Sequence, residues 1–242
     1  MKAPFGIAAL VAALATPSSL GAAAAPADVP AAEPVPVRLM SETVFATTDA
    51  TRGPDQYMYL YAYRTRPGAA VAGARPFAMR ELAMLALERA VGIAIYESAP
   101  PAGKPVWVFS GGAVADVARG RWHPDTISAM PDKRAHFRIG TPSPEMLPPP
   151  LRRAIAEHMR TVDHVETPKI AMMIVDDASG TPDGRYYVAV NLRRSAYATQ
   201  DAWTDALHRI EWFIPPSLVF FRPPMSEPGF EQLFSGVEPL SP

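Results

Sequence analysis

The chain has 242 residues, a formal net charge of −1 and a hydrophobic share of 48%. This length is enough for one large domain or two small ones, and the near-zero charge excludes the basic field that nucleic-acid binding requires. Cysteine is absent, which excludes disulfide bonds, thiolate catalysis and zinc sites built from cysteine.

The first 24 residues have the pattern of a secretory signal peptide. Lys2 supplies a positive charge, residues 5–15 are apolar, and three alanines end at Ala24. We expect cleavage near Ala24, no membrane span afterwards, and a bacterial protein that is periplasmic or secreted. The alternative is an uncleaved anchor, but the apolar run is shorter than the roughly 20 residues that cross a bilayer. Residues 25–38 are rich in proline and alanine, which predicts a disordered leader.

Residues 57–63, YMYLYAY, alternate strictly and predict a β-strand. One face of this strand carries Tyr57, Tyr59, Tyr61 and Tyr63. The first interpretation is a structural strand whose tyrosine rings cover one side of a sheet. The second is an aromatic binding surface made by the four rings, and these four are our candidate binding residues.

The segment that follows predicts a helix packed against a sheet. Pro76 suits the first turn of a helix, and residues 77–91 are apolar on most sides. Gly92 is expected to end this helix as a left-handed cap. The next predicted elements are a strand at 93–96, a strand at 106–109, a short helix at 114–118 and a strand at 136–139.

Residues 141–150, TPSPEMLPPP, form a candidate linker. The elements predicted after it are a helix at 151–162, strands at 170–177 and 186–192, a helix at 200–213 and a short strand at 218–221. The run IAMMIV at the start of the first strand does not alternate, which predicts a strand covered on both faces. The tail, residues 224–242, is expected to be irregular and weakly packed.

These elements indicate an α+β fold in two halves. Residues 39–140 form the expected N-terminal domain, and residues 151–223 form the expected C-terminal domain. Each half has the order helix, strand, strand, helix, strand, with a mixed or antiparallel sheet packed by helices. A duplication would explain this order, but the same order also arises in unrelated α+β proteins.

The second half also resembles a known family. The sequence from PPPLRRAIAEHM through IAMMIV and YYVAV to FIPPSLVFF is similar to the C-terminal domain of the SseB (enhanced serine sensitivity protein) family, over roughly residues 145–223. The segment GIAIYESAPPAGKPVWVFSGGAVADV resembles uncharacterised bacterial relatives. The resemblance implies an α+β fold without an established enzymatic activity, and it supplies no functional residues. The signal peptide departs from the family's usual cytoplasmic setting.

An enzymatic alternative starts from Ser110, which follows a strand and precedes a helix. A secreted hydrolase or metal-dependent enzyme would use Ser110 with His123 and Asp125, or a cluster of histidines. The nucleophile pattern G-x-S-x-G is absent, because Val108 occupies the place of its first glycine. The two glycines after Ser110 are explained more simply by a turn.

Metal sites have little support in the sequence. The five histidines are His123, His136, His158, His164 and His208. They form no H-E-x-x-H motif. Three aspartates crowd one turn, namely Asp176, Asp177 and Asp183, but a hairpin loop favours these residues without calcium. We expect no cofactor.

The sequence therefore favours a non-catalytic binding or protein-interaction module over an enzyme. We expect its contacts at the strand of residues 57–63 and in a groove between the two halves, where ligands often bind. The expected partner is an envelope or periplasmic protein, not nucleic acid, and the oligomeric state stays open. A third interpretation, a structural subunit of an envelope complex, predicts a contiguous exposed apolar patch.

Overall fold

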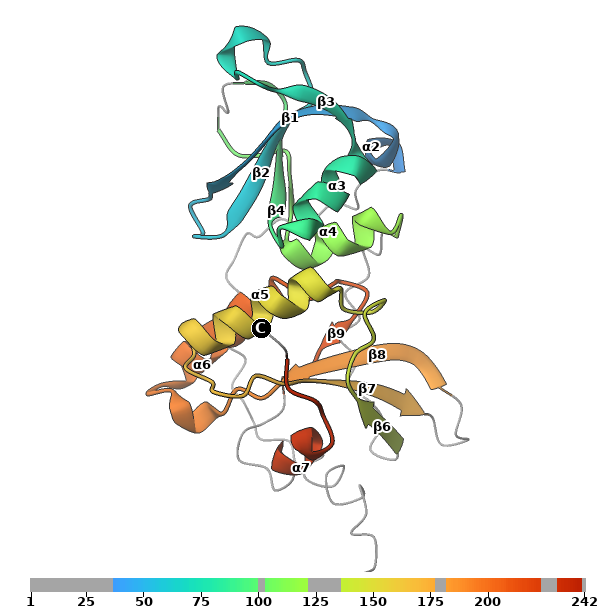
Figure 1. The fold of residues 1–242 in the computed structure, drawn as a ribbon, viewed down its shortest axis with the longest axis vertical. Helices are drawn as coiled ribbons and strands as arrows, with labels where there is room; N and C mark the ends of the chain where they lie inside the picture. The colour runs from blue at the N-terminus through green and yellow to red at the C-terminus, as the bar shows by residue number, and fades with distance from the viewer. Residues whose placement is uncertain (1–36, 100–102, 122–135, 177–181, 223–229, 241–242) are drawn as a thin grey trace, which may run out of the picture.

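The computed structural model describes residues 37–99, 103–121, 136–176, 182–222 and 230–240. Two β-sheets lie one above the other in the view of Figure 1, and helices pack on each of them. The structure is thus an α+β fold in two halves, as the order of elements predicts.

Five strands form the first sheet. In spatial order they are β3 (Arg75–Ala78), β1 (Thr43–Arg52), β2 (Met58–Tyr63), β4 (Gly92–Tyr96) and β5 (Trp107–Phe109). β2 and β4 are parallel, and the other neighbours are antiparallel. The strands predicted near residues 57–63, 93–96 and 106–109 are present, whereas the prediction contains no strand at β1.

Helices cover one face of this sheet. The helical elements of the first half are α2 (Val37–Ser41), a 3-10 turn (Gly68–Ala70), α3 (Met79–Glu88) and α4 (Gly111–Ala118). α3 and α4 pack against each other and against the same face of the sheet. α4 begins after Ser110, whose Oγ accepts a hydrogen bond from the backbone N–H of Ala113 at 3.1 Å. Beneath the helices lies a core that includes Leu60, Leu82 and Ile93.

Both ends of α3 differ from the prediction. Pro76 lies in β3, an edge strand, where its missing N–H is tolerated. Gly92 does not cap the helix, because it is the first residue of β4. The left-handed residue after α3 is Ala90, with φ of 53°. Gly92 is required for close packing instead, since a Cβ there would lie 2.5 Å from the carbonyl oxygen of Phe109.

The second sheet contains β6 (His136–Gly140), β7 (Ile170–Asp176), β8 (Pro182–Val190) and β9 (Val219–Phe220), in this spatial order. Its helical elements are α5 (Pro149–Thr161), a 3-10 turn (Arg194–Ala196) and α6 (Gln200–Glu211). Sequence order places β6 in the first half, but β6 pairs with β7, so the second half begins before the expected boundary at residue 140. Both halves still contain the order helix, strand, strand, helix, with the two strands antiparallel.

The prediction that β7 is covered on both faces is confirmed. Ile170 packs in the core beneath α5 and α6, whereas Met173 packs on the opposite side of the sheet. The cover on that side is α7 (Phe230–Ser235), whose Leu233 and Phe234 are buried. The described part of the tail, residues 230–240, is therefore not weakly packed, which corrects the prediction for these residues. Helix α7 has only six residues, too few to show a helical period in the sequence.

The two halves meet where α4 approaches the turn after α6. The backbone N–H of Gly112 donates to the carbonyl of Trp212 at 3.0 Å. The buried carboxylate of Asp116 accepts hydrogen bonds from the backbone N–H and the hydroxyl of Ser217, each at 2.9 Å. Ala115 belongs to the core of the second half. Direct packing thus fills the interface along this line, where the sequence predicts a groove.

Candidate functional site

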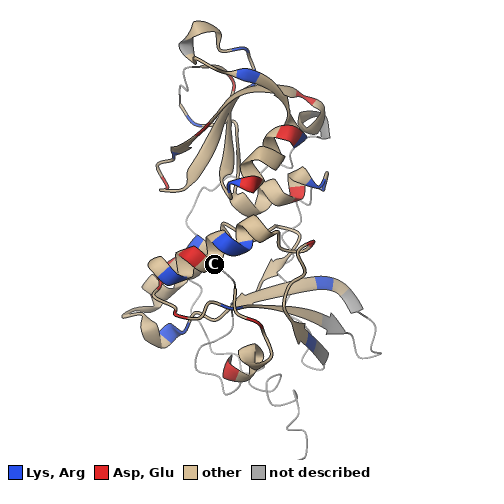
Figure 2. Ribbon diagram, viewed as in Figure 1, with Lys and Arg blue, Asp and Glu red and all other residues tan. Residues whose placement is uncertain are grey.

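The face of the first sheet opposite α3 and α4 is lined by aromatic and aliphatic side chains. Leu60 and Ala62 are buried on the helix side, so the tyrosines that alternate with them point the other way. Ala94 of β4 continues this second face between Tyr61 of β2 and Val108 of β5, because it pairs with both. β2, β4 and β5 carry no charged residue, as Figure 2 shows for β2 and β4.

The four candidate binding tyrosines do not share one environment. Tyr59 and Tyr63 are each only 4% exposed, whereas Tyr57 and Tyr61 are partly exposed. Neighbouring rings account for part of this burial, since the ring of Tyr96 lies 6.2 Å from that of Tyr63 and 5.4 Å from that of Tyr61. An exposed surface made by all four rings is therefore not present. A binding role for the partly exposed rings stays a prediction.

Tyr57 and Tyr59 connect the first half to the second. The ring of Tyr57 stacks on Trp212, with centroids 4.3 Å apart and planes 2° from parallel. The Nε1–H of Trp212 donates to the hydroxyl of Tyr59 at 3.3 Å, and this hydroxyl donates to the carboxylate of Asp55 at 2.5 Å. Burial raises the pKa of both phenols, so each stays protonated at neutral pH. These two tyrosines are thus structural contacts between the halves.

The exposed apolar side chains on this side of the sheet lie farther from Trp212. We call Tyr61, Tyr96, Val106 and Val108 the outer face. Val106 and Val108 are 45% and 53% exposed; Val108 lies in the edge strand β5, and Val106 directly precedes that strand. Val108 pairs with Ala94, which places its side chain on the same side of the sheet as Tyr61. The outer face therefore presents two aliphatic side chains beside two partly exposed phenol rings.

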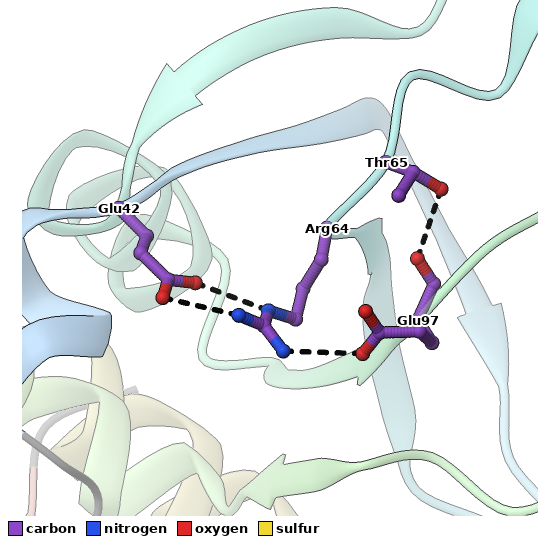
Figure 3. A network of polar contacts seen from close by, with 4 residues as sticks. All are labelled: Glu42, Arg64, Thr65 and Glu97. Carbon is purple, nitrogen blue, oxygen red and sulfur yellow. Dashed lines mark hydrogen bonds and ion pairs between the residues drawn. The ribbon is translucent and has the colours of Figure 1, made fainter.

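A charged network lies at the end of β2 (Figure 3). Arg64 donates two hydrogen bonds of 3.1 Å to the carboxylate of Glu42 and one of 3.2 Å to that of Glu97. The hydroxyl of Thr65 donates to the carbonyl of Glu97 at 3.0 Å. Hydrogen bonding to Glu42 raises the pKa of Arg64, and the guanidinium also lies 5.4 Å from the ring of Trp107. Because these groups are partly exposed, the network contributes little to the free energy of unfolding, and its main effect is to hold the three side chains in place.

A second cluster of polar side chains lies between α5 and α6. We call His158, Asp163, Tyr197 and Arg209 the polar cluster. Asp163 is 8% exposed, and its Oδ1 accepts a hydrogen bond from the hydroxyl of Tyr197 at 2.8 Å. His158 Nε2 lies 3.7 Å from Asp163 Oδ2, and Arg209 Nη2 lies 3.9 Å from Oδ1. Both distances exceed those of hydrogen bonds, and His158 Nε2 and Asp163 Oδ2 have no partner among the described residues.

Burial controls the charges in the polar cluster. It lowers the pKa of His158, the Asp163 carboxylate opposes this shift, and the Arg209 guanidinium adds to it. His158 is therefore neutral at pH 7. Burial and the hydrogen bond to Asp163 together raise the pKa of Tyr197, which keeps its hydroxyl a donor. The cluster joins α5 and α6 to the loops beside them, and this arrangement supports a structural role in the second half.

The sequence contains only weak signals for the polar cluster. His158 is one of the five histidines considered for metal binding. The residues around it in the structure do not lie at sequence spacings that are typical of metal ligands. Asp163 follows the end of α5 by two residues, and Tyr197 precedes α6 by three. Aspartate and tyrosine at such positions are ordinary in loops, so no local pattern could have identified the cluster.

The described residues do not bring together the side chains that the enzymatic alternative requires. Ser110 caps α4, and its Oγ accepts a hydrogen bond there. His123, Asp125 and Asp177 lie outside the residues that the structure describes, and the side chains of His136, Asp176 and Asp183 are not described either. Within the described ranges, no group of three or more His, Asp and Glu side chains could hold a metal ion. The triad of Ser110, His123 and Asp125 stays a prediction.

None of the described helices is both long enough and apolar enough to cross a membrane. No protein-family model, curated protein or solved structure matches the chain. Function must therefore be argued from the surfaces and contacts of the molecule itself.

Proposed function

We propose that the protein is an exported, non-catalytic interaction module that binds another protein of the bacterial envelope through the outer face. The observation that supports this most is the exposure of Val106 and Val108, at 45% and 53%, beside the partly exposed rings of Tyr61 and Tyr96. Aromatic and aliphatic side chains free of charge are typical of the centre of protein interfaces. Exposed apolar side chains gathered on one side of a sheet mark interaction sites more often than scattered ones do.

Two features of the sequence agree with the same role. Export is supported by the signal-peptide pattern of residues 1–24. The resemblance of residues 145–223 to the SseB family agrees with a module that has no catalytic activity.

The chain contains no cysteine, so a single introduced cysteine can be labelled specifically. A Val108→Cys variant, labelled with a photo-crosslinker, is incubated with envelope extract from the source organism. The control is Met84→Cys, because Met84 is 52% exposed but belongs to α3, on the other face of the sheet. We expect one discrete crosslinked protein from the label at Val108 and none from the label at Met84. Equal crosslinking at both positions, or none at either, would contradict the proposal.

A second measurement uses the purified partner. We expect Val108→Glu to weaken its binding about tenfold or more, because the complex would bury a charge in place of the valine side chain. Substitution of Tyr59 is unsuitable for this purpose, since Tyr59 contacts Trp212 and its loss would disturb the interface between the halves.

A further inference from the structure

In the second sheet, the face opposite α5 and α6 is covered by the C-terminal segment of the chain. Four side chains of β7 and β8 on this face are at most 3% exposed, namely Ala171, Met173, Tyr187 and Ala189. They pack against three apolar residues of the C-terminal segment, namely Leu233, Phe234 and Val237. Lys169 Nζ secures this segment by donating to the carbonyl of Phe234 at 2.9 Å. A short helix with two apolar anchors, followed by a third anchor just after the helix, therefore covers this part of the face.

The outer face occupies the corresponding side of the first sheet, although β5 is an edge strand and β8 lies between β7 and β9. In both halves a helix, two antiparallel strands and a second helix follow one another, and both helices pack on one side of the strands. On the other side Ala94 pairs with Val108, as Ala171 pairs with Ala189. Ala189 is 0% exposed beneath its cover, whereas Val108 is 53% exposed. The two faces thus differ in the cover that each receives from the described part of the chain.

We propose that the outer face docks a short apolar segment of the partner protein, in which a helical turn presents two adjacent aliphatic or aromatic anchors and the residues after the turn present a third one three positions later. This is the spacing of Leu233, Phe234 and Val237 in the chain's own cover. The inference rests on the proposed function, because it names the kind of segment that the partner contributes. Helix recognition through such apolar anchors is a common mode of peptide binding.

The test uses the protein's own cover as a probe. A fluorescent peptide of residues 229–240, GFEQLFSGVEPL, is titrated with the purified full-length protein, and its anisotropy is measured. The second sheet already holds its own α7, so we expect added peptide to bind at the outer face, and the variants at Val108 and Val106 distinguish this from exchange with α7. We expect saturable binding that Val108→Glu weakens about tenfold or more. Met84→Glu, on the opposite side of the sheet, is expected to leave the binding unchanged.

Two further controls make the result specific. A peptide with Leu233→Ser and Phe234→Ser is expected not to bind, since it lacks two anchors. Val106→Glu is a second variant of the outer face, and circular dichroism confirms that each variant is folded. Both valines are about half exposed, so these substitutions do not disturb the core.

Three outcomes would overturn the inference. One is peptide binding that neither Val108→Glu nor Val106→Glu changes. Another is no peptide binding while the crosslinked partner attaches through a strand or an irregular loop. The third is a concentration-dependent dimer that Val108→Glu abolishes, which would assign the outer face to a second copy of the chain. Failure of the crosslinking alone would instead contradict the proposed function, because the peptide reports the chemistry of the face independently of any partner.

Discussion

At the scale of single residues, the two glycines at the start of α4 are explained by close approach. A Cβ at Gly111 would lie 2.6 Å from the ring of Trp212, and a Cβ at Gly112 would lie 2.0 Å from the carbonyl oxygen of Ile214. Neither glycine has a left-handed φ, so the turn itself does not require them. The contact at Gly112 is with backbone atoms, which cannot rotate away as a flexible side chain would.

The first prediction therefore concerns Gly112→Ala. In an ordinary helix this change stabilises by about 1 kcal/mol. Here we expect it to lower the free energy of unfolding by about 2–4 kcal/mol, because the added methyl group meets backbone atoms. Denaturant unfolding measures the difference. Gly140→Ala is the control, since a Cβ there meets nothing within 4 Å, and we expect it to change stability by less than about 0.5 kcal/mol. A Gly112→Ala variant as stable as the wild type would refute the close approach.

A second prediction at this scale concerns His158 and pH. An unfolded histidine titrates near 6.5, whereas burial lowers the pKa of His158 in the folded protein. The folded state thus binds this proton less readily than the unfolded state. The contribution of His158 to stability is therefore complete above about pH 6.5 and is lost as the pH falls below that value.

The measurement compares unfolding free energies between about pH 7.5 and about pH 5. We expect the wild type to lose more stability over this range than His158→Gln, because glutamine does not titrate. His208→Gln, at an exposed position on α6, is expected to follow the wild type. Identical pH dependence of the wild type and His158→Gln would show that burial of His158 has no thermodynamic effect.

At the scale of elements, the sequence predicts those that have a regular pattern. The alternation of β2, the unbroken apolar run of β7 and the helical spacing of α5 and α6 all correspond to observed elements. β1 is missed because its pairing with β2 shifts register between Ala46 and Ala50, which interrupts the alternation. α7 is missed because six residues form fewer than two turns.

The candidate site is less predictable than the elements that carry it. The alternation of residues 57–63 indicates which side chains share a face, and the structure agrees with that pattern. It does not indicate which of them are exposed, because burial depends on distant residues. Trp212, for example, reaches Tyr59 across 153 positions of the chain. Local patterns contain no information about such contacts, so the division between structural and exposed tyrosines required the fold.

At the scale of the whole molecule, the interface makes the two halves depend on each other. Trp212 contacts Tyr57 and Tyr59 of the first sheet, while the hydroxyl and backbone N–H of Ser217 bind the buried carboxylate of Asp116. Separation of the halves would expose aromatic surface and leave that carboxylate without its hydrogen bonds, both of which cost free energy. We therefore expect the halves to unfold together.

The corresponding prediction is a single unfolding transition for the wild type, measured in parallel by tryptophan fluorescence and circular dichroism. Trp212→Ala is expected to lower stability by about 2–4 kcal/mol and to separate the two signals, because it removes the stacking on Tyr57 and the hydrogen bond to Tyr59. Trp107→Ala is the matched control, since Trp107 packs against the core of the first half and beside Arg64, which also belongs to that half. It should destabilise the protein without separating the signals. Two transitions in the wild type would mean that the halves fold independently and that the contacts of Trp212 do not couple them.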